Sequence, residues 1–237
     1  MMKWSAKTSV YFLLATAFCR MCFAGDGSFN SDCVDEVGGQ KTEKRIVGAF
    51  DSVDIKGSFA FIISCGDDYG LEITCNRNLL PYISAEVKNR TLSVYAKKSI
   101  CTTRGIQIII TAPGIRSIDA SGSNDISVKG VDNQGIAIGL DGAGKLNISG
   151  MTKKFKAHLA GSNHLDAKNL HSAKSSITIA GSSEASVYAS EVLDINISGV
   201  GKITYYGTPK TVLKNISGIG HPMSIASKTL VNHYFQN

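Results

Sequence analysis

The chain has 237 residues, a formal net charge of +6, 24 glycines and 4 prolines. Only 19% of the residues are charged and 8% are aromatic, which argues against a bundle of long amphipathic helices. A hydrophobic fraction of 43% with a small net charge also argues against intrinsic disorder.

The first 24 residues have the pattern of a secretory signal peptide. Lys3 and Lys7 precede the apolar run Val10–Phe18, and small residues at Cys22 and Ala24 predict cleavage after Ala24. The apolar run is too short for a stable transmembrane helix. A retained anchor and a lipoprotein are the alternatives. We therefore expect an exported protein in the periplasm, on the outer surface or outside the cell.

Half of the net positive charge belongs to this segment. It holds three of the 25 basic residues, Lys3, Lys7 and Arg20, and no acid, so the net charge of the mature chain falls from +6 to +3. The remaining basic residues form no dense run. Nucleic-acid binding therefore loses most of its support.

Two segments precede the regular part of the chain. Residues 25–44 are polar, and we expect a flexible leader there. From residue 45 to 112 the alternation of apolar and polar residues is weaker, with a hairpin turn at Asn89-Arg90. Strands are predicted at residues 59–64, 71–75, 83–88, 92–96 and 106–111.

From residue 113 to 226 one unit recurs. Apolar residues lie two and four positions before its first glycine, and four after it, in nearly every copy. This alternation on both sides of a bend predicts strand, turn and strand. Two positions after that glycine, Gly or Asn predominates, and we expect a left-handed conformation in this second column. The intervals between the first glycines of successive copies are 20, 19, 20, 18 and 19 residues. These glycines are Gly122, Gly142, Gly161, Gly181, Gly199 and Gly218.

A unit of about 19 residues cannot bury its apolar face alone, so the copies must stack. The fold predicted is all-β, a right-handed parallel β-helix with about six regular coils of 18–20 residues. Residues 53–59 resemble residues 118–124, so the N-terminal half is expected to form irregular coils that cover the open edge. Residues 227–237 are expected to form a cap or tail. An antiparallel barrel or sandwich is the alternative, but it does not explain the near-constant interval.

Four cysteines follow the predicted cleavage site. In an exported chain they predict two disulfides, for which three pairings are possible, and the pairing stays open. A zinc site is the weaker alternative, because no two of them are spaced as CxxC. These cysteines are Cys33, Cys65, Cys75 and Cys101.

Three motifs in a fixed order resemble a known family. They are RIVGAFDSVDIKG at residues 45–57, NLLPYI at 78–83, and IDASGS at 118–123, followed by further SG repeats. Together they are similar to the head GIN domain of putative auto-transporter adhesins, over about residues 44–226. The resemblance implies a bacterial cell-envelope or secreted β-helical domain, and it brings no catalytic residues.

Histidines and acids form no recognised catalytic or metal-binding pattern. His158 and His164 flank one turn without a compact ligand spacing, and the sequence holds no GxSxG motif. Asp119, Asp125 and Asp141 are the nearest carboxylate cluster, but the column of Asp119 holds no acid in the next coils. We expect no catalysis, no metal and no cofactor. A polysaccharide lyase or hydrolase is the less favoured alternative.

One outward column predicts a binding face. Seven positions after the glycine, Lys168, Tyr188 and Tyr206 follow one another in successive coils. Exposed aromatic rings beside polar groups can hold a sugar ring or a partner chain. The function predicted is adhesin-like, non-catalytic binding of a surface glycan or of an envelope or host protein. In the alternative, the tyrosines only stabilise the sheet, and the chain is a structural spacer or a self-assembling rod.

A second outward column, three positions after the glycine, carries both signs of charge. Stacking would make Asp125–Lys145 and Glu184–Lys202 exposed cross-coil pairs, each contributing a fraction of a kcal/mol. The column consists of Asp125, Lys145, His164, Glu184, Lys202 and His221.

Overall fold

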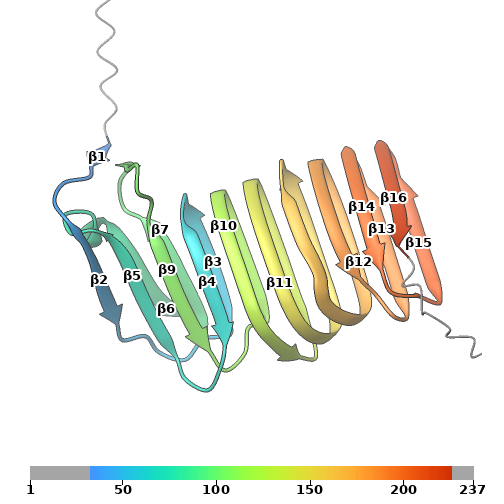
Figure 1. Cartoon of the computed structure of the whole chain (residues 1–237), viewed down its shortest axis with the longest axis horizontal. Helices are drawn as coiled ribbons and strands as arrows, with labels where there is room; N and C mark the ends of the chain where they lie inside the picture. The colour runs from blue at the N-terminus through green and yellow to red at the C-terminus, as the bar shows by residue number, and fades with distance from the viewer. Residues whose placement is uncertain (1–32, 226–237) are drawn as a thin grey trace, which may run out of the picture. The chain divides into compact units, whose positions relative to one another are not determined.

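The structure is a computed structural model that describes residues 33–225. The predicted signal peptide and the predicted C-terminal cap lie outside these residues. The unit Cys33–Asn237 is compact by itself. Its described part is a solenoid of parallel β-strands (Figure 1).

Three long strands form the middle of the solenoid. Each follows the chain through a glycine bend and pairs in parallel with its neighbour, so that Gly122 lies opposite Gly142 and Gly161 opposite Gly181. This register confirms the predicted β-helix and is not compatible with an antiparallel barrel. The strands are β10 (Ser117–Asn133), β11 (Ile136–Gly161) and β12 (His164–Tyr188).

The last two coils are each divided into two strands, which continue the same register. The solenoid makes about five turns rather than six, because six glycine rows are separated by five turns of the chain. The divided strands are β13 (Val192–Ile197), β14 (Val200–Tyr206), β15 (Thr211–Ile216) and β16 (Ile219–Ile225).

The N-terminal half forms the irregular start of the same solenoid, as predicted. β3 (Ser52–Gly57) and β4 (Ala60–Cys65) pair in parallel with the two arms of β10. β7 (Thr91–Ala96) and β9 (Gln107–Ala112) stack on β3 and β4, although they follow them in sequence. The coil of residues 52–65 is therefore enclosed between a later segment and β10.

Antiparallel strands close this end of the solenoid. β6 (Ile83–Lys88) forms a hairpin with β7 through Asn89-Arg90, where both residues have positive φ. β5 (Gly70–Asn76) pairs with β9, and β2 (Gln40–Arg45) pairs with β5. β2 has the sequence QKTEKR, and charged side chains on an outer strand disfavour pairing with another chain. The N-terminal half therefore covers this edge, as predicted.

The expectation of a flexible leader at residues 25–44 is wrong for its described part. β1 (Val34–Asp35) pairs with β8 (Ile100–Cys101), and β2 belongs to the main sheet. The hydroxyl groups of Thr102 and Thr103 donate hydrogen bonds to Glu36 and lower the pKa of its carboxyl group to about 2. Polar composition misleads here, because the contacts that hold the segment come from far along the chain.

Arg45 joins β2 to a short 3-10 helix, η1 (Leu80–Tyr82). Its guanidinium group donates hydrogen bonds to the carbonyl oxygens of Leu80 and Ile83, at 3.0 and 2.6 Å. The same side chain forms an ion pair with Glu43 at 2.7 Å. These contacts fix β2 against η1 and the start of β6.

One disulfide is present in the described residues instead of two. Cys33 is bonded to Cys101 across 68 residues, with a Cα–Cα distance of 5.6 Å. Cys65 and Cys75 are free thiols, and burial raises the pKa of both.

The geometry of β9 explains the free thiols. Cys65 lies opposite Ala112 of β9, whereas Thr74, next to Cys75, lies opposite Gln107. Cys75 therefore falls opposite residue 106, six residues from Ala112, so the two Cα atoms are about 20 Å apart along the strand direction. A disulfide joins Cα atoms about 4.4–6.8 Å apart. The expectation of a second disulfide is thus wrong.

The first glycine column determines how closely the coils stack. A Cβ on Gly142 would lie 2.7 Å from the carbonyl oxygen of Gly122, and Gly161 and Gly181 meet the preceding glycine in the same way. Gly122, Gly142, Gly161 and Gly181 all have positive φ, between +97° and +151°. The left-handed conformation therefore belongs to the first column, and its assignment to the second column is wrong.

The second column serves another purpose, because its side chains point inward. Asn124, Asn163 and Ser183 are buried. The amide of Asn163 donates to the carbonyl oxygen of Ala160 at 2.8 Å and accepts from the backbone N–H of Gly144 at 2.8 Å. Asparagine thus joins two coils at the bend, and glycine at the same position leaves room for this side chain.

Replacing Gly142 by alanine should lower the free energy of unfolding by about 3 kcal/mol. Positive φ costs an L-residue about 1–2 kcal/mol, and overlap with the Gly122 carbonyl adds a similar amount. Gly48→Ala is the matched control, because no atom lies within 4 Å of its Cβ position. Urea unfolding followed by circular dichroism measures both. Equal stability of the two variants would contradict the glycine-stack interpretation.

Removing the disulfide should also destabilise the fold. A bond that closes a loop of 68 residues stabilises by up to about 4 kcal/mol, through restriction of the unfolded chain. We expect a loss of this order in the Cys33→Ser, Cys101→Ser double variant and in the native chain under dithiothreitol. Cys65→Ser is the control, because it breaks no disulfide. Calorimetry that shows no difference between double variant and control would contradict the expectation.

Candidate functional site

A groove crosses the coils on the arm that follows the glycine column. Its volume is about 860 Å³. Each coil contributes the same three positions, one to three residues after the glycine, so the groove follows from the repeat itself. Most of its lining lies at residues 58–60, 123–125, 143–145, 162–164, 182–184 and 200–202.

Small side chains form the floor of the groove. The position directly after the glycine holds Ser123, Ala143, Ser162 and Ser182 in four successive coils. Because none of these side chains is large, the surface stays hollow over the length of these coils. The hydroxyl groups give the floor both donors and acceptors of hydrogen bonds.

The charged column forms the rim of the groove. Lys202 Nζ lies 2.5 Å from one carboxylate oxygen of Glu184, and His164 Nδ1 lies 3.7 Å from the other. The hydrogen bond from Lys202 lowers the pKa of Glu184, and the positive charge of Lys202 acts in the same direction. The predicted Glu184–Lys202 pair is confirmed, and Asp125 lies in register with Lys145. The rim therefore carries both signs of charge.

The predicted tyrosine face lies further along the same arm. Tyr188 is in register with Tyr206, and both are half-buried. The Lys168 ammonium group donates to Asp166 at 2.6 Å, and this bond, together with the charges of Asp166 and Tyr206, raises the pKa of Lys168. The structure thus brings the three predicted residues together. We call Lys168, Tyr188 and Tyr206 the tyrosine patch.

His171 is a neighbour of the tyrosine patch that sequence reasoning missed. Its ring centroid lies 4.5 Å from that of Tyr188, with an interplanar angle of 64°. The pairing of β11 with β12 shifts register between Asn147 and Ser149, so column counting fails beyond that point. The groove is not predicted either, because the charged column by itself indicates only isolated solvated pairs. The run of small residues beside that column is the signal that could have revealed it.

The three clustered carboxylates are not brought together. Asp119 and Asp141 line a small cavity of about 270 Å³ with Asp54 and His158, whereas Asp125 lines the groove. Desolvation raises the pKa of Asp119, and the negative charge of Asp54 adds to the effect. His158 also lines the small cavity, whereas His164 lines the groove.

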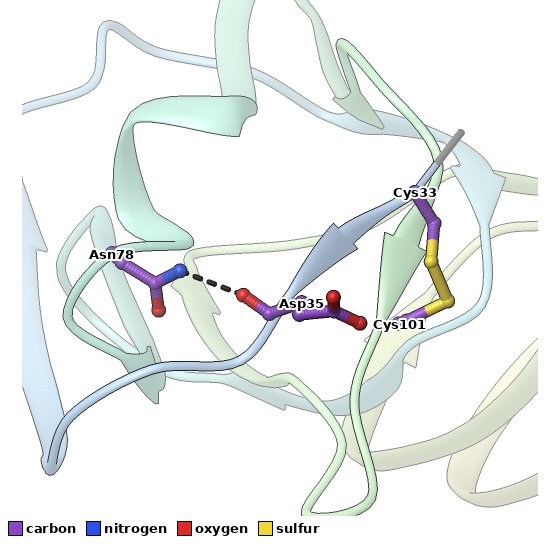
Figure 2. The surroundings of a disulfide bond; sticks show 4 residues. All are labelled: Cys33, Asp35, Asn78 and Cys101. Carbon is purple, nitrogen blue, oxygen red and sulfur yellow. Dashed lines mark hydrogen bonds between the residues drawn. A yellow bond between two sulfur atoms is a disulfide. The ribbon is translucent and has the colours of Figure 1, made fainter. Parts of the chain in front are cut away.

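One group of three metal-type ligands occurs within residues 33–225. It consists of Cys33, Asp35 and Cys101 (Figure 2). The two sulfurs are bonded to each other, so neither is a free thiolate ligand. Asn78 donates to the backbone carbonyl of Asp35 at 2.8 Å and fixes the strand beside the disulfide. The group is structural. Across the same part of the chain, no helix is long and apolar enough to cross a membrane.

The family model described as "Putative auto-transporter adhesin, head GIN domain" matches residues 49–209. The chain belongs to this family. Its description names putative adhesins, and the GIN domain accounts for most of the solenoid. A search of curated proteins gives no match.

Solved structures share the fold of this GIN domain. A putative adhesin from Bacteroides fragilis has a TM-score of 0.68 at 20% identity, covering 81% of this chain and 100% of that chain. A putative lipid binding protein from Parabacteroides distasonis has a TM-score of 0.54 at 21% identity, covering 81% and 99%. A putative adhesin from Parabacteroides merdae has a TM-score of 0.52 at 18% identity, covering 82% of this chain and 99% of that chain. At such identities the likeness shows the fold alone.

Neutralising Asp119 should stabilise the GIN domain at neutral pH. Its pKa in the folded state is raised above the ordinary value of 3.8, so the charged form is disfavoured by folding. The penalty is complete above the raised pKa and absent below 3.8, where the carboxyl group is protonated in both states. Asp119→Asn should therefore raise the urea midpoint at pH 7 and leave it unchanged at about pH 3. An equal gain at both pH values would contradict this cause.

Proposed function

We propose that this GIN domain is an exported, non-catalytic binding module of the bacterial cell envelope. Its groove would hold a glycan chain across several coils. The observation that carries the proposal is the continuity of the groove, whose volume of about 860 Å³ falls in the range of ligand sites, roughly 300–1,000 Å³.

The chemistry of the groove favours a neutral, hydroxyl-rich polymer. Ser123, Ser162 and Ser182 offer hydroxyl groups in three of the four coils, and the rim offers carboxylate, ammonium and imidazole groups. Sugar hydroxyls pair with both donors and acceptors. Because Glu184 lies between His164 and Lys202, the rim does not favour one sign of charge. An extended glycan meets these conditions better than a polyanion does.

The tyrosine patch supplies a second contact surface in this proposal. His171 packs against Tyr188 and restricts its ring, and Lys168 and Asp166 place a donor and an acceptor beside Tyr206. Rigid aromatic rings beside polar groups suit a sugar ring or a protein partner. The patch and the groove lie on the same arm of the coils.

Export and the adhesin-like role have separate support. The signal-peptide pattern and the Cys33–Cys101 disulfide both fit an oxidising compartment. The putative adhesins of the same fold suggest attachment to a surface. The alternative of a self-assembling rod is less well supported, because β2 presents charged residues at the edge of the sheet.

Filling the groove should abolish glycan binding. The Ser162→Trp variant places a large ring on the groove floor, and we expect at least a tenfold loss of affinity for glycans that the native chain retains on an array. Thr178→Trp is the matched control, since it puts the same ring on the other arm of a neighbouring coil. Tyr188→Ala with Tyr206→Ala should weaken binding several-fold.

Three outcomes decide the proposal. A loss in Ser162→Trp alone supports the groove, and a further loss in the double variant supports the tyrosine patch. If Tyr188→Ala with Tyr206→Ala loses glycan binding and Ser162→Trp does not, the site lies at the tyrosine patch rather than in the groove. Absence of any bound glycan, or equal binding by all variants, would overturn the proposed function.

A further inference from the structure

The last coil reverses the pattern of the other coils. In most coils, three outward side chains are small or polar. They lie five positions before the first glycine, one position after it and five positions after it. In the last coil, these positions and the outward seventh position hold large apolar residues. They are Leu213, Ile219, Met223 and Ile225, with exposed fractions of 53%, 61%, 56% and 43%.

Three inward positions of the same coil change in the opposite sense, whereas Val212 and Ile216 stay apolar, opposite Leu193 and Ile197. Lys214 lies opposite Ile195, Pro222 opposite Ile203, and Ser224 opposite Tyr205. A coil that only extended the core would place its apolar residues inward. The reversal therefore indicates that the apolar side chains of this coil face something outside the solenoid.

Neighbouring residues extend the apolar surface over two coils. Val200, which is 52% exposed, lies in register with Ile219, and Tyr206 lies in register with Ile225. β14 and β16 lie side by side at the C-terminal end of the described chain (Figure 1). We call Val200, Tyr206, Ile219, Met223 and Ile225 the terminal apolar patch.

The charge around this patch has one sign. Asp194 is the last acidic residue of the sequence, and every charged residue after it is a lysine. Lys202, Lys210 and Lys214 lie on the last two coils and are exposed. His221 lies between Ile219 and Met223 on the outward face of β16. Lysines therefore flank the apolar surface, and the acid nearest to it, Glu184, is paired with Lys202.

We propose that the terminal apolar patch docks on an anionic lipid bilayer. Apolar side chains enter the boundary between headgroups and acyl chains, and nearby lysines are attracted to anionic headgroups. Docking of two copies through these patches would bring like charges together. A soluble polyanion would leave the apolar side chains exposed to water. An anionic lipid surface accounts for both the exposed apolar side chains and the lysines near them.

This surface is separate from the greater part of the groove. Val200, Lys202 and His221 line the end of the groove, but Met223, Ile225, Lys210 and Lys214 do not. Variants of these four positions therefore test lipid docking without altering the lining of the groove.

The test is vesicle flotation with a chain that starts at Gly25 and keeps the compact unit Cys33–Asn237. The probes are vesicles of phosphatidylglycerol with phosphatidylethanolamine, and vesicles of phosphatidylcholine. We expect binding to the anionic vesicles, weakened by salt. Lys210→Glu with Lys214→Glu should reduce it at least about thirtyfold. Met223→Ser with Ile225→Ser should reduce it about tenfold or more.

Matched controls separate docking from general effects. Lys154→Glu with Lys156→Glu makes the same charge change on exposed positions of β11, and Met151→Ser removes an apolar residue that is 60% exposed there. Both should bind vesicles as the native chain does. Circular dichroism and thermal melting confirm that each variant is folded, and the glycan array shows that the groove still functions.

Several results would overturn the proposal. Equal binding to both kinds of vesicle, or none, excludes recognition of anionic lipid. Heparin binding that needs the lysines but not Met223 and Ile225 indicates an acidic polymer instead. Lipid-independent dimers that the Met223→Ser, Ile225→Ser variant abolishes indicate a second copy. Vesicle binding that appears only after removal of residues 226–237 indicates that the chain's own tail occupies the patch.

Discussion

The close approach of one glycine to the next along the solenoid is the constraint on which the rest of the structure depends. At Gly142 the backbone comes so near to Gly122 that no side chain fits between them, and the same contact recurs in the neighbouring coils. The bend must therefore occur at one residue of every coil, and all coils must keep one register. The hydrophobic columns contribute the burial that stabilises the fold, but the glycine stack decides which residues share a column.

The surface features follow from this register. Because position one after the bend is small in successive coils, a hollow forms that no single coil could make alone. Because position three holds a charged residue or a histidine in every regular coil, the hollow acquires a polar rim, with Glu184 held between Lys202 and His164. Asn163 ties the backbone beneath this region to the adjacent coil. A continuous groove thus results from repetition and needs no specialised loop.

The sequence predicted what alternation and interval encode locally. The aliphatic columns, such as Ile138 and Leu140, are buried because period-two alternation is a property of each strand. The hairpin at Asn89-Arg90 was predictable for the same reason. The groove was not, because the columns alone do not show which side of the bend is hollow. The positive φ of the first column depends on contacts between coils. The ordering of β1 and the Cys33–Cys101 bond depend on residues 68 positions apart, beyond the reach of local patterns.

The order of the first coils has a consequence for how the chain folds as it emerges. The coil of residues 52–65 has neighbours on both sides, and the outer neighbour consists of residues 91–112. A chain that appears N-terminus first cannot complete this coil until the later segment has also appeared. The outer face of β3 and β4 then stays unpaired during that interval. The first part to be synthesised is therefore among the last to be finished, and protection of exposed strand edges is needed most at that stage.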